Sequence, residues 1–131
     1  MPIKKITEFT NNLQNGSAFL SAGPDGKTDS IPQASVSYIE MPPGGEVKPH
    51  THNRVEVYIF LTGRATAMAG ETITEVSTGD VLIAPIGTPH ALRVIGSEPL
   101  RYYAFNAPPA STCPMISAPE EVLWKWNEST M

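Results

Sequence analysis

Apolar and polar residues alternate along several short stretches of this chain, the pattern of strands that bury one face. The clearest stretch is VEVYIFL, residues 55–61. One face of this predicted strand is aliphatic and the other carries an acid and two aromatic rings. The aliphatic face consists of Val55, Val57, Ile59 and Leu61, and the opposite face of Glu56, Tyr58 and Phe60. We expect the aliphatic face to be covered, either by other packing within the fold or by a partner subunit.

Further runs rich in strand-forming residues are separated by turns that contain glycine and proline. They cover residues 31–41, 46–52, 64–70, 71–78, 79–90, 91–96 and 100–107. No strong helical period lies between them. Many short strands with closely spaced turns predict an all-β fold, an antiparallel sandwich or barrel.

The two ends of the chain have different patterns from the centre. Residues 1–30 are predicted to form an N-terminal arm, with a short helical turn around Ile6–Leu13 and a loop over SAGPDGKTD, residues 21–29. Residues 31–108 are predicted to form the β-barrel. Residues 109–131 form a C-terminal tail in which EEVLWKWNE, residues 120–128, fits a short helix or a strand.

Composition supports a turn-rich fold and excludes several classes of function. The 131 residues include 13 prolines, roughly twice the usual ~5% share, and 10 glycines. The net charge is −4 and no dense Lys/Arg run occurs, which argues against nucleic acid and anionic membrane surfaces as partners. No apolar run is long enough to span a bilayer, and the first residues lack the apolar core of a secretory signal. The single cysteine, Cys113, is expected to be an inert thiol in a cytoplasmic protein.

Two of the three histidines lie one residue apart, in PHTHNRVE. On a strand, His50 and His52 point the same way, with roughly 6.6 Å between their Cα atoms at ~3.3 Å rise per residue. Glu56 begins the next strand, and His90 follows a Pro-rich turn further along the chain. The string alone is compatible with a metal site and with ordinary hydrogen-bonded histidines.

The glycines and prolines around these residues resemble the two motifs of the cupin family. The first motif, G-x5-H-x-H-x3,4-E-x6-G, is matched at every position by Gly44, His50, His52, Glu56 and Gly63. The second, G-x5-P-x-G-x2-H-x3-N, is matched by Gly79, Pro85, Gly87 and His90, but ends at Val94 in place of asparagine. The resemblance covers roughly residues 31–108, and the arm and the tail lie outside it.

This resemblance implies a small single-domain cupin with an antiparallel jelly-roll barrel. It implies that His50, His52, Glu56 and His90 bind one divalent transition metal per chain, Mn, Fe, Ni, Co or Zn. Small cupins are commonly dimers, so it also implies a homodimer.

The ligand set indicates the kind of chemistry to expect. Three neutral imidazoles and one carboxylate leave a divalent ion with one net positive charge, which favours an anionic small molecule. Tetrahedral zinc would be closed by four protein ligands, whereas an octahedral metal keeps positions for substrate. Two functions follow. One is a metal-dependent enzyme, an oxygenase, isomerase, cyclase or lyase, acting on a carboxylate, enol or carbonyl compound that coordinates the metal. The other is a non-catalytic sensor or carrier.

Residues near the ligands are candidates for the pocket wall. Lys48, two residues before His50, is a catalytic candidate if it shares the face of that histidine. Tyr58 and Phe60 are candidate substrate-binding residues, with ordinary barrel core as the alternative. Tyr103 and Phe105, or Tyr102 in the other strand phase, are candidates for the opposite wall.

Overall fold

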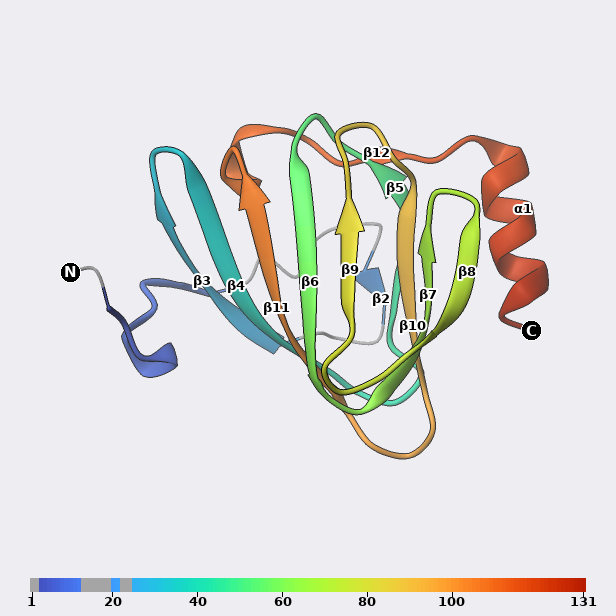
Figure 1. Ribbon diagram of the computed structural model, residues 1–131, viewed down its shortest axis with the longest axis horizontal. Coiled ribbons are helices and arrows are strands. Elements are labelled where there is room, and N and C mark those ends of the chain that lie inside the picture. The colour runs from blue at the N-terminus through green and yellow to red at the C-terminus, as the bar shows by residue number, and fades with distance from the viewer. Residues whose placement is uncertain (1–2, 13–19, 22–24) are drawn as a thin grey trace.

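Two antiparallel six-stranded sheets face each other in a jelly-roll barrel (Figure 1). The computed structural model describes residues 3–12, 20–21 and 25–131. Sheet A contains, in spatial order, β1 (Asn11–Asn12), β3 (Asp25–Ile31), β4 (Ala34–Met41), β11 (Leu100–Ala107), β6 (Val55–Thr62) and β9 (Val81–Ala84). Sheet B contains β12 (Ile116–Ser117), β5 (Glu46–Thr51), β10 (His90–Ile95), β7 (Arg64–Ala69) and β8 (Thr72–Val76), with β2 (Leu20–Ser21) also paired to β5. The predicted all-β jelly roll is confirmed.

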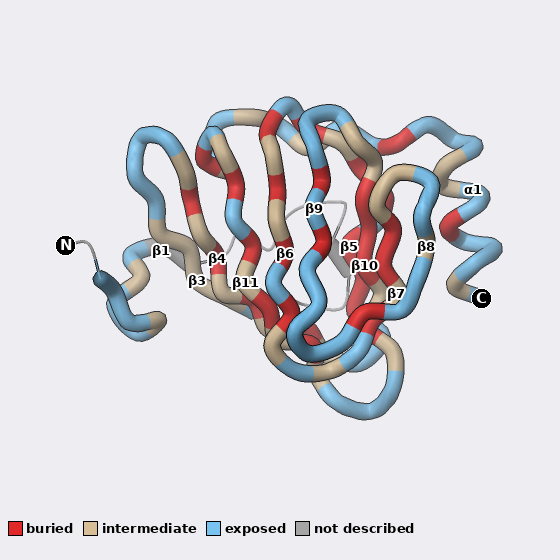
Figure 2. Tube along the Cα trace, in the orientation of Figure 1, coloured by how far each residue is buried: buried red, intermediate tan, exposed pale blue. Residues whose placement is uncertain are grey.

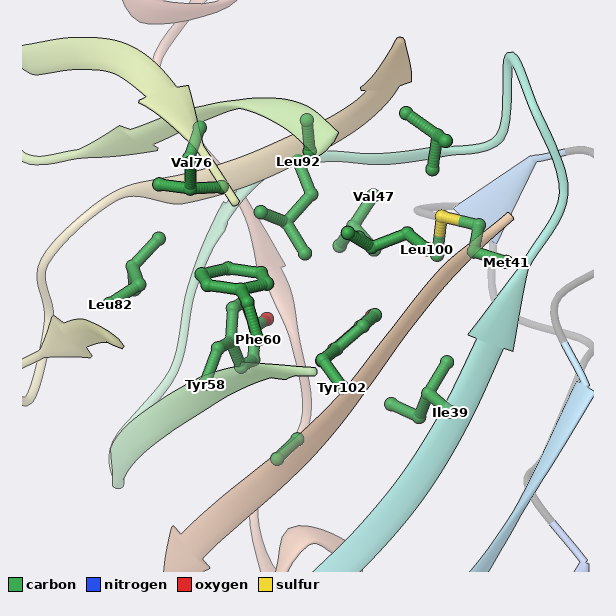
Figure 3. Close-up of a cluster of buried hydrophobic side chains, with 14 of the residues drawn as sticks. Ile39, Met41, Val47, Tyr58, Phe60, Val76, Leu82, Leu92, Leu100 and Tyr102 are labelled. Carbon is green, nitrogen blue, oxygen red and sulfur yellow. The ribbon is translucent and has the colours of Figure 1, made fainter. Parts of the chain in front are cut away.

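The core lies between the two sheets and follows the alternation seen in the sequence. In β6 the side chains of Glu56, Tyr58 and Phe60 are buried, as the pattern predicted. Buried positions alternate with partly buried ones along most of the neighbouring strands β4 and β11, as the tube in Figure 2 shows. Apolar side chains from both sheets meet in the interior (Figure 3), among them Ile39, Met41, Val47, Phe60, Leu82, Leu92, Leu100 and Tyr102.

The N-terminal region differs from the prediction. Residues 21–29 were expected to form a loop, but β3 begins at Asp25 and pairs along its length with β4. A turn at Pro32–Gln33 joins the two strands, so the predicted strand 31–41 is in fact the end of one strand and all of the next. Glycine is required in this strand because a Cβ at Gly26 would collide with the carbonyl oxygen of Tyr38. The turn-like composition is therefore that of a hairpin near the edge of sheet A, where only the two-residue β1 lies outside β3 among the described strands.

The described residues near the N-terminus contain one short helical turn. It is the 3-10 helix η1 (Ile6–Glu8), shorter than the turn predicted around Ile6–Leu13. Leu13 itself, and residues 22–24 of the predicted loop, lie outside the described residues.

The C-terminal tail crosses one end of the barrel and then packs on the outer face of sheet B (Figure 1). After β11 it forms the 3-10 helix η2 (Ala110–Thr112), then β12 and the helix α1 (Glu120–Ser129). Residues 120–128, for which the sequence allowed a helix or a strand, therefore form a helix. Its Trp126 is fully buried against Met68 and Ala91, and the indole Nε1 donates a hydrogen bond of 2.7 Å to Glu46 Oε2.

Candidate metal centre

Four buried side chains from three strands and a turn converge at one end of the barrel. His50 is the last residue but one of β5, His90 begins β10, and these two residues are direct partners in sheet B. His52 lies in the turn that follows β5, and Glu56 reaches the group from β6 in sheet A. The ligand atoms of all four residues lie within 4.8 Å of one another. The structure thus brings together the four residues singled out by the sequence and places them to hold a metal ion.

The three imidazoles share one tautomer. Each Nδ1 contacts a backbone carbonyl: Lys48 O at 2.8 Å for His50, Arg54 O at 3.0 Å for His52 and Thr88 O at 2.9 Å for His90. Because a carbonyl only accepts hydrogen bonds, each Nδ1 carries a hydrogen. The Nε2 lone pairs are therefore left for the interior of the cluster, the arrangement that metal-ligating histidines adopt.

The short distances between nitrogen and oxygen atoms within the cluster indicate that a proton or a metal ion lies between them. Nε2 of His52 and Nε2 of His90 each lie 2.9 Å from the same oxygen, Oε1 of Glu56. An unprotonated Nε2 and a carboxylate oxygen are both acceptors, so they repel unless a proton or a metal ion lies between them. The donor set of three imidazole nitrogens and one carboxylate fits a divalent transition metal.

The surroundings favour the protonation states that metal binding needs. Burial and the neighbouring His90 lower the pKa of His50 to about 3, so its ring is neutral at physiological pH. Burial alone would raise the pKa of Glu56, but the close contacts of its carboxylate with the His52 and His90 rings outweigh burial and hold that pKa below its usual range. A neutral imidazole and an ionised carboxylate are the forms that bind metal.

Two residues that the sequence reasoning missed support Glu56. Asn106 Nδ2 donates to Glu56 Oε2 at 3.0 Å, and Arg54 Nε donates to Asn106 Oδ1 at 2.7 Å. Arg54 Nη1 also donates to the backbone carbonyl of Cys113. A polar residue at the end of an otherwise apolar inward row on β11 was the available signal for Asn106. A charged residue inside the first motif was the signal for Arg54.

Lys48 does not join the site, and a β-bulge explains why. Between β10 and β5 the register runs from His90↔His50 to Leu92↔Val47, so β5 contains one extra residue at Lys48–Pro49. The bulge reverses the alternation, which turns both Val47 and His50 inward and leaves Lys48 exposed. The expectation that Lys48 shares the face of His50 is wrong.

The aromatic candidates divide between the two faces of sheet A. Tyr58 and Phe60 point into the barrel (Figure 3). Tyr58 Oη donates to Glu56 Oε1 at 3.2 Å. On β11 the inward phase belongs to Tyr102, whose ring centroid lies 5.2 Å from that of Tyr58. Tyr103 and Phe105 lie on the outer face, so they cannot form the opposite wall of the pocket as expected, and the strand phase with Tyr102 inward is the one found.

Cys113 lies at the same end of the barrel but outside the cluster. Its thiol is partly exposed and donates to the carbonyl of Asn53 at 3.4 Å.

Among the described residues no helix is long and apolar enough to cross a membrane.

Comparison with known proteins gives consistent results. A family model described as "Cupin domain" matches residues 37–106. The uncharacterized protein SCO3923 of Streptomyces coelicolor is 39% identical over 64 residues, which cover 49% of this chain and 58% of that protein. The chain therefore matches less than two thirds of the length of this relative.

Two solved structures share the fold over most of both chains. A cupin-2 domain protein of Rhodospirillum rubrum, Rru_A2000, has a TM-score of 0.72 at 20% identity, covering 89% of this chain and 79% of the other. The polyketide cyclase RemF of Streptomyces resistomycificus also has a TM-score of 0.72, at 16% identity, and covers 98% of this chain and 93% of its own. At these identities the similarity establishes the fold alone.

Proposed function

Because this chain belongs to the cupin family, we propose that it is a divalent-metal-dependent enzyme whose small oxygenated substrate coordinates the metal. The substrate class is a carboxylate, enol or carbonyl compound. The observation that carries the proposal is the convergence of four buried donors, with the imidazole tautomers already set for metal binding. A group of three histidines and an acid buried at one point has no evident use in a purely structural protein.

The ligands would be Nε2 of the three histidines and the carboxylate of Glu56. The ion, Mn, Fe, Co, Ni or Zn, would polarise a carbonyl or stabilise an enolate when bound. Its net charge among these ligands is +1, which favours an anionic substrate.

Side chains beside the ligands would orient and enclose the substrate. Burial, followed by the charge of Glu56, raises the pKa of Tyr58 well above its ordinary value, so its hydroxyl stays protonated. That hydroxyl lies next to Glu56 and would donate a hydrogen bond to a substrate oxygen there. Phe60 and Tyr102 pack against Tyr58 and would exclude water from this side of the ligand.

The reaction would be that of an oxygenase, isomerase, cyclase or lyase. The nearly full-length similarity to the polyketide cyclase RemF is the reason to test enolisable carbonyl compounds first. In each of these reactions an oxygen atom of the substrate would bind the metal. Binding of small oxygen ligands to the metal is therefore the property to test.

Metal analysis of the purified protein, combined with optical and electron paramagnetic resonance spectra, tests the proposal. We expect one divalent transition metal per chain, with a spectrum that changes when oxalate, catechol or a β-diketone is added. One zinc ion per chain in a closed tetrahedral site, with no response to these ligands, would contradict the proposal that the protein is an enzyme. It would favour the alternative, a non-catalytic sensor or carrier.

We further propose that the protein acts as a homodimer that buries the outer face of sheet A. Cross-strand register aligns two apolar rows on this face, and exposed side chains of Ile59, Val81, Ile83 and Phe105 contribute to them. The rows are Val36–Phe105–Val57–Ile83 and Tyr38–Tyr103–Ile59–Val81. Segment 4–9 lies across part of the face, around a hollow of about 720 Å³. None of the described residues covers the β9 side, where Val81 and Ile83 are exposed, and this is where a second copy would pack.

A further inference from the structure

Arg54 is buried at the same end of the barrel as the metal ligands. It is only 4% exposed, although arginine side chains normally keep their charged ends in water. In the described part of the chain its guanidinium pairs with no carboxylate, and its hydrogen bonds go to the amide oxygen of Asn106 and the carbonyl of Cys113. A buried charge needs such partners, so both contacts are expected to be essential to its placement.

The guanidinium fixes the orientation of the Asn106 amide. Arginine can only donate hydrogen bonds, so the amide group facing it must be the oxygen Oδ1. The amide nitrogen Nδ2 must then face the other way, towards Oε2 of Glu56, at 3.0 Å. Without Arg54 the amide could rotate and present its oxygen to the carboxylate, which would repel it.

The hydrogen bond from Asn106 to Oε2 of Glu56 in turn fixes the direction in which the other oxygen, Oε1, points. Asn106 and Glu56 are direct partners in the β11–β6 register, so the backbone brings the two side chains together. With Oε2 occupied by the amide, Oε1 is the oxygen that faces Nε2 of His52 and of His90. The carboxylate is thus pre-oriented with one oxygen towards the point where the imidazoles converge.

We propose that Arg54 and Asn106 are positioning residues that set the orientation of Glu56 for metal binding, with the Cys113 carbonyl of the tail as their outer anchor. This inference rests on the proposed function in that Glu56 is taken as a metal ligand. The C-terminal tail lies beyond the family match at residues 37–106, yet it is part of the site. Its β12 pairs with β5 at His50 and Thr51, which holds the tail against the ligands.

Cobalt(II) binding to the metal-free protein tests this chain of contacts. Affinity is measured by competition with a chromophoric chelator, and the geometry of the site is followed by the visible cobalt spectrum. We expect Asn106→Leu and Arg54→Met each to weaken cobalt binding ~10- to 100-fold, the usual effect of changing the partner of a metal ligand, and to shift the spectrum.

Two matched controls separate this effect from general damage. Arg101→Met removes an arginine of the same strand as Asn106 that pairs with Glu40 on the surface. Cys113→Ala keeps the carbonyl that Arg54 uses and removes only the thiol. Both controls should bind cobalt within about twofold of the wild type. Thermal unfolding of each metal-free variant reports whether it is folded.

The double variant Arg54→Met/Asn106→Leu gives the sharpest result. Since Arg54 acts through Asn106, the double variant should lose no more affinity than Asn106→Leu alone. Losses that multiply, or wild-type affinity and spectrum in Asn106→Leu, would overturn the inference. If Arg54→Met does not fold, Asn106→Leu and the smaller Asn106→Ser decide the question by the same criteria. A wild-type protein that binds no cobalt would instead overturn the proposed function itself.

Discussion

Hydrogen bonds to backbone carbonyls give each histidine of the cluster its role before any ligand arrives. His50 and His90 each bond a carbonyl two residues earlier in the chain, and His52 bonds one two residues later. The strand and turn geometry that places each ring therefore also selects its tautomer. This pre-organisation lowers the cost of binding, because the rings need not flip.

Removing one imidazole should empty the site. We expect His50→Ala and His90→Ala each to lose most of the bound metal, because a divalent ion loses one of four protein ligands and gains an unfilled space. Metal content per chain, measured after equilibration with a chelating resin, checks this. Lys48→Ala is the matched control, since the exposed Lys48 lies two residues from His50 and should leave metal content unchanged. Full occupancy in either histidine variant would mean that the ligand set is wrong.

The buried titrating groups should make the metal-free protein sensitive to acid. The pKa of His50 is about 3 when folded and near its ordinary value of 6.5 when unfolded, so the unfolded state binds the proton first. Stability is then lost as the pH falls from about 6.5 towards 3. Glu56 acts in the same direction, because its folded pKa lies below the ordinary 4.5.

Urea unfolding of the metal-free protein at a series of pH values from 7 to 4 checks this expectation. The urea midpoint should fall steadily on acidification, and His50→Gln should flatten the fall because it removes a group whose pKa drops from 6.5 to about 3 on folding. A midpoint that rises towards pH 5 would contradict the sign of these shifts.

At the scale of elements, the sequence predicted the strands whose alternation is regular and missed the interruptions. The pattern of VEVYIFL identified both faces of β6, and the glycine and proline spacing identified the cluster. By contrast, Lys48 was misplaced because a bulge at Lys48–Pro49 depends on how β5 pairs with β10, which no local pattern encodes. Likewise, the phase of β11 depends on pairing, since Tyr102 and Tyr103 are equally suited to a buried face.

Strand β3 and the residues Arg54 and Asn106 were hard to predict for a related reason. β3 contains glycine, lysine and two aspartates, a turn-like composition, and it is a strand because β4 supplies its partners. Arg54 and Asn106 escaped notice since their importance lies in contacts across 52 residues of sequence. In both cases the structure is determined by contacts between residues far apart in the sequence, and local propensity does not reveal them.

Helix α1 should contribute strongly to stability through a single side chain. Trp126 is fully buried against sheet B and bonded to Glu46, whereas Trp124, two residues earlier, is 70% exposed. Trp126→Ala should lower the free energy of unfolding by about 3–5 kcal/mol, and Trp124→Ala by less than about 0.5 kcal/mol. Trp126→Phe should fall between them, because it keeps most of the apolar contact and leaves Glu46 without its donor. Urea unfolding gives all three values, and equal effects at the two tryptophans would contradict this account.

At the scale of the whole molecule, the outer face of sheet B is covered by a helix, whereas part of the outer face of sheet A is exposed. α1 packs on sheet B, while the β9 side of sheet A keeps Val81 and Ile83 at 51% and 61% exposure. β9 is also an edge strand, so its backbone is open on one side. A contiguous apolar surface beside an open edge is a typical site for association with a second copy.

Charged substitutions on this surface test the homodimer. Size-exclusion chromatography with light scattering should show a dimer for the wild type at micromolar concentrations. Val81→Lys and Ile83→Lys should each weaken dimerisation on the order of a hundredfold or more, because a lysine there would be buried without a partner. Both side chains are exposed in the single chain, so the fold and the metal site should be unaffected. Ile86→Lys, at 57% exposure in the loop after β9, is the control and should remain dimeric. A monomeric wild type, or dimers in all three variants, would show that this face serves no such contact.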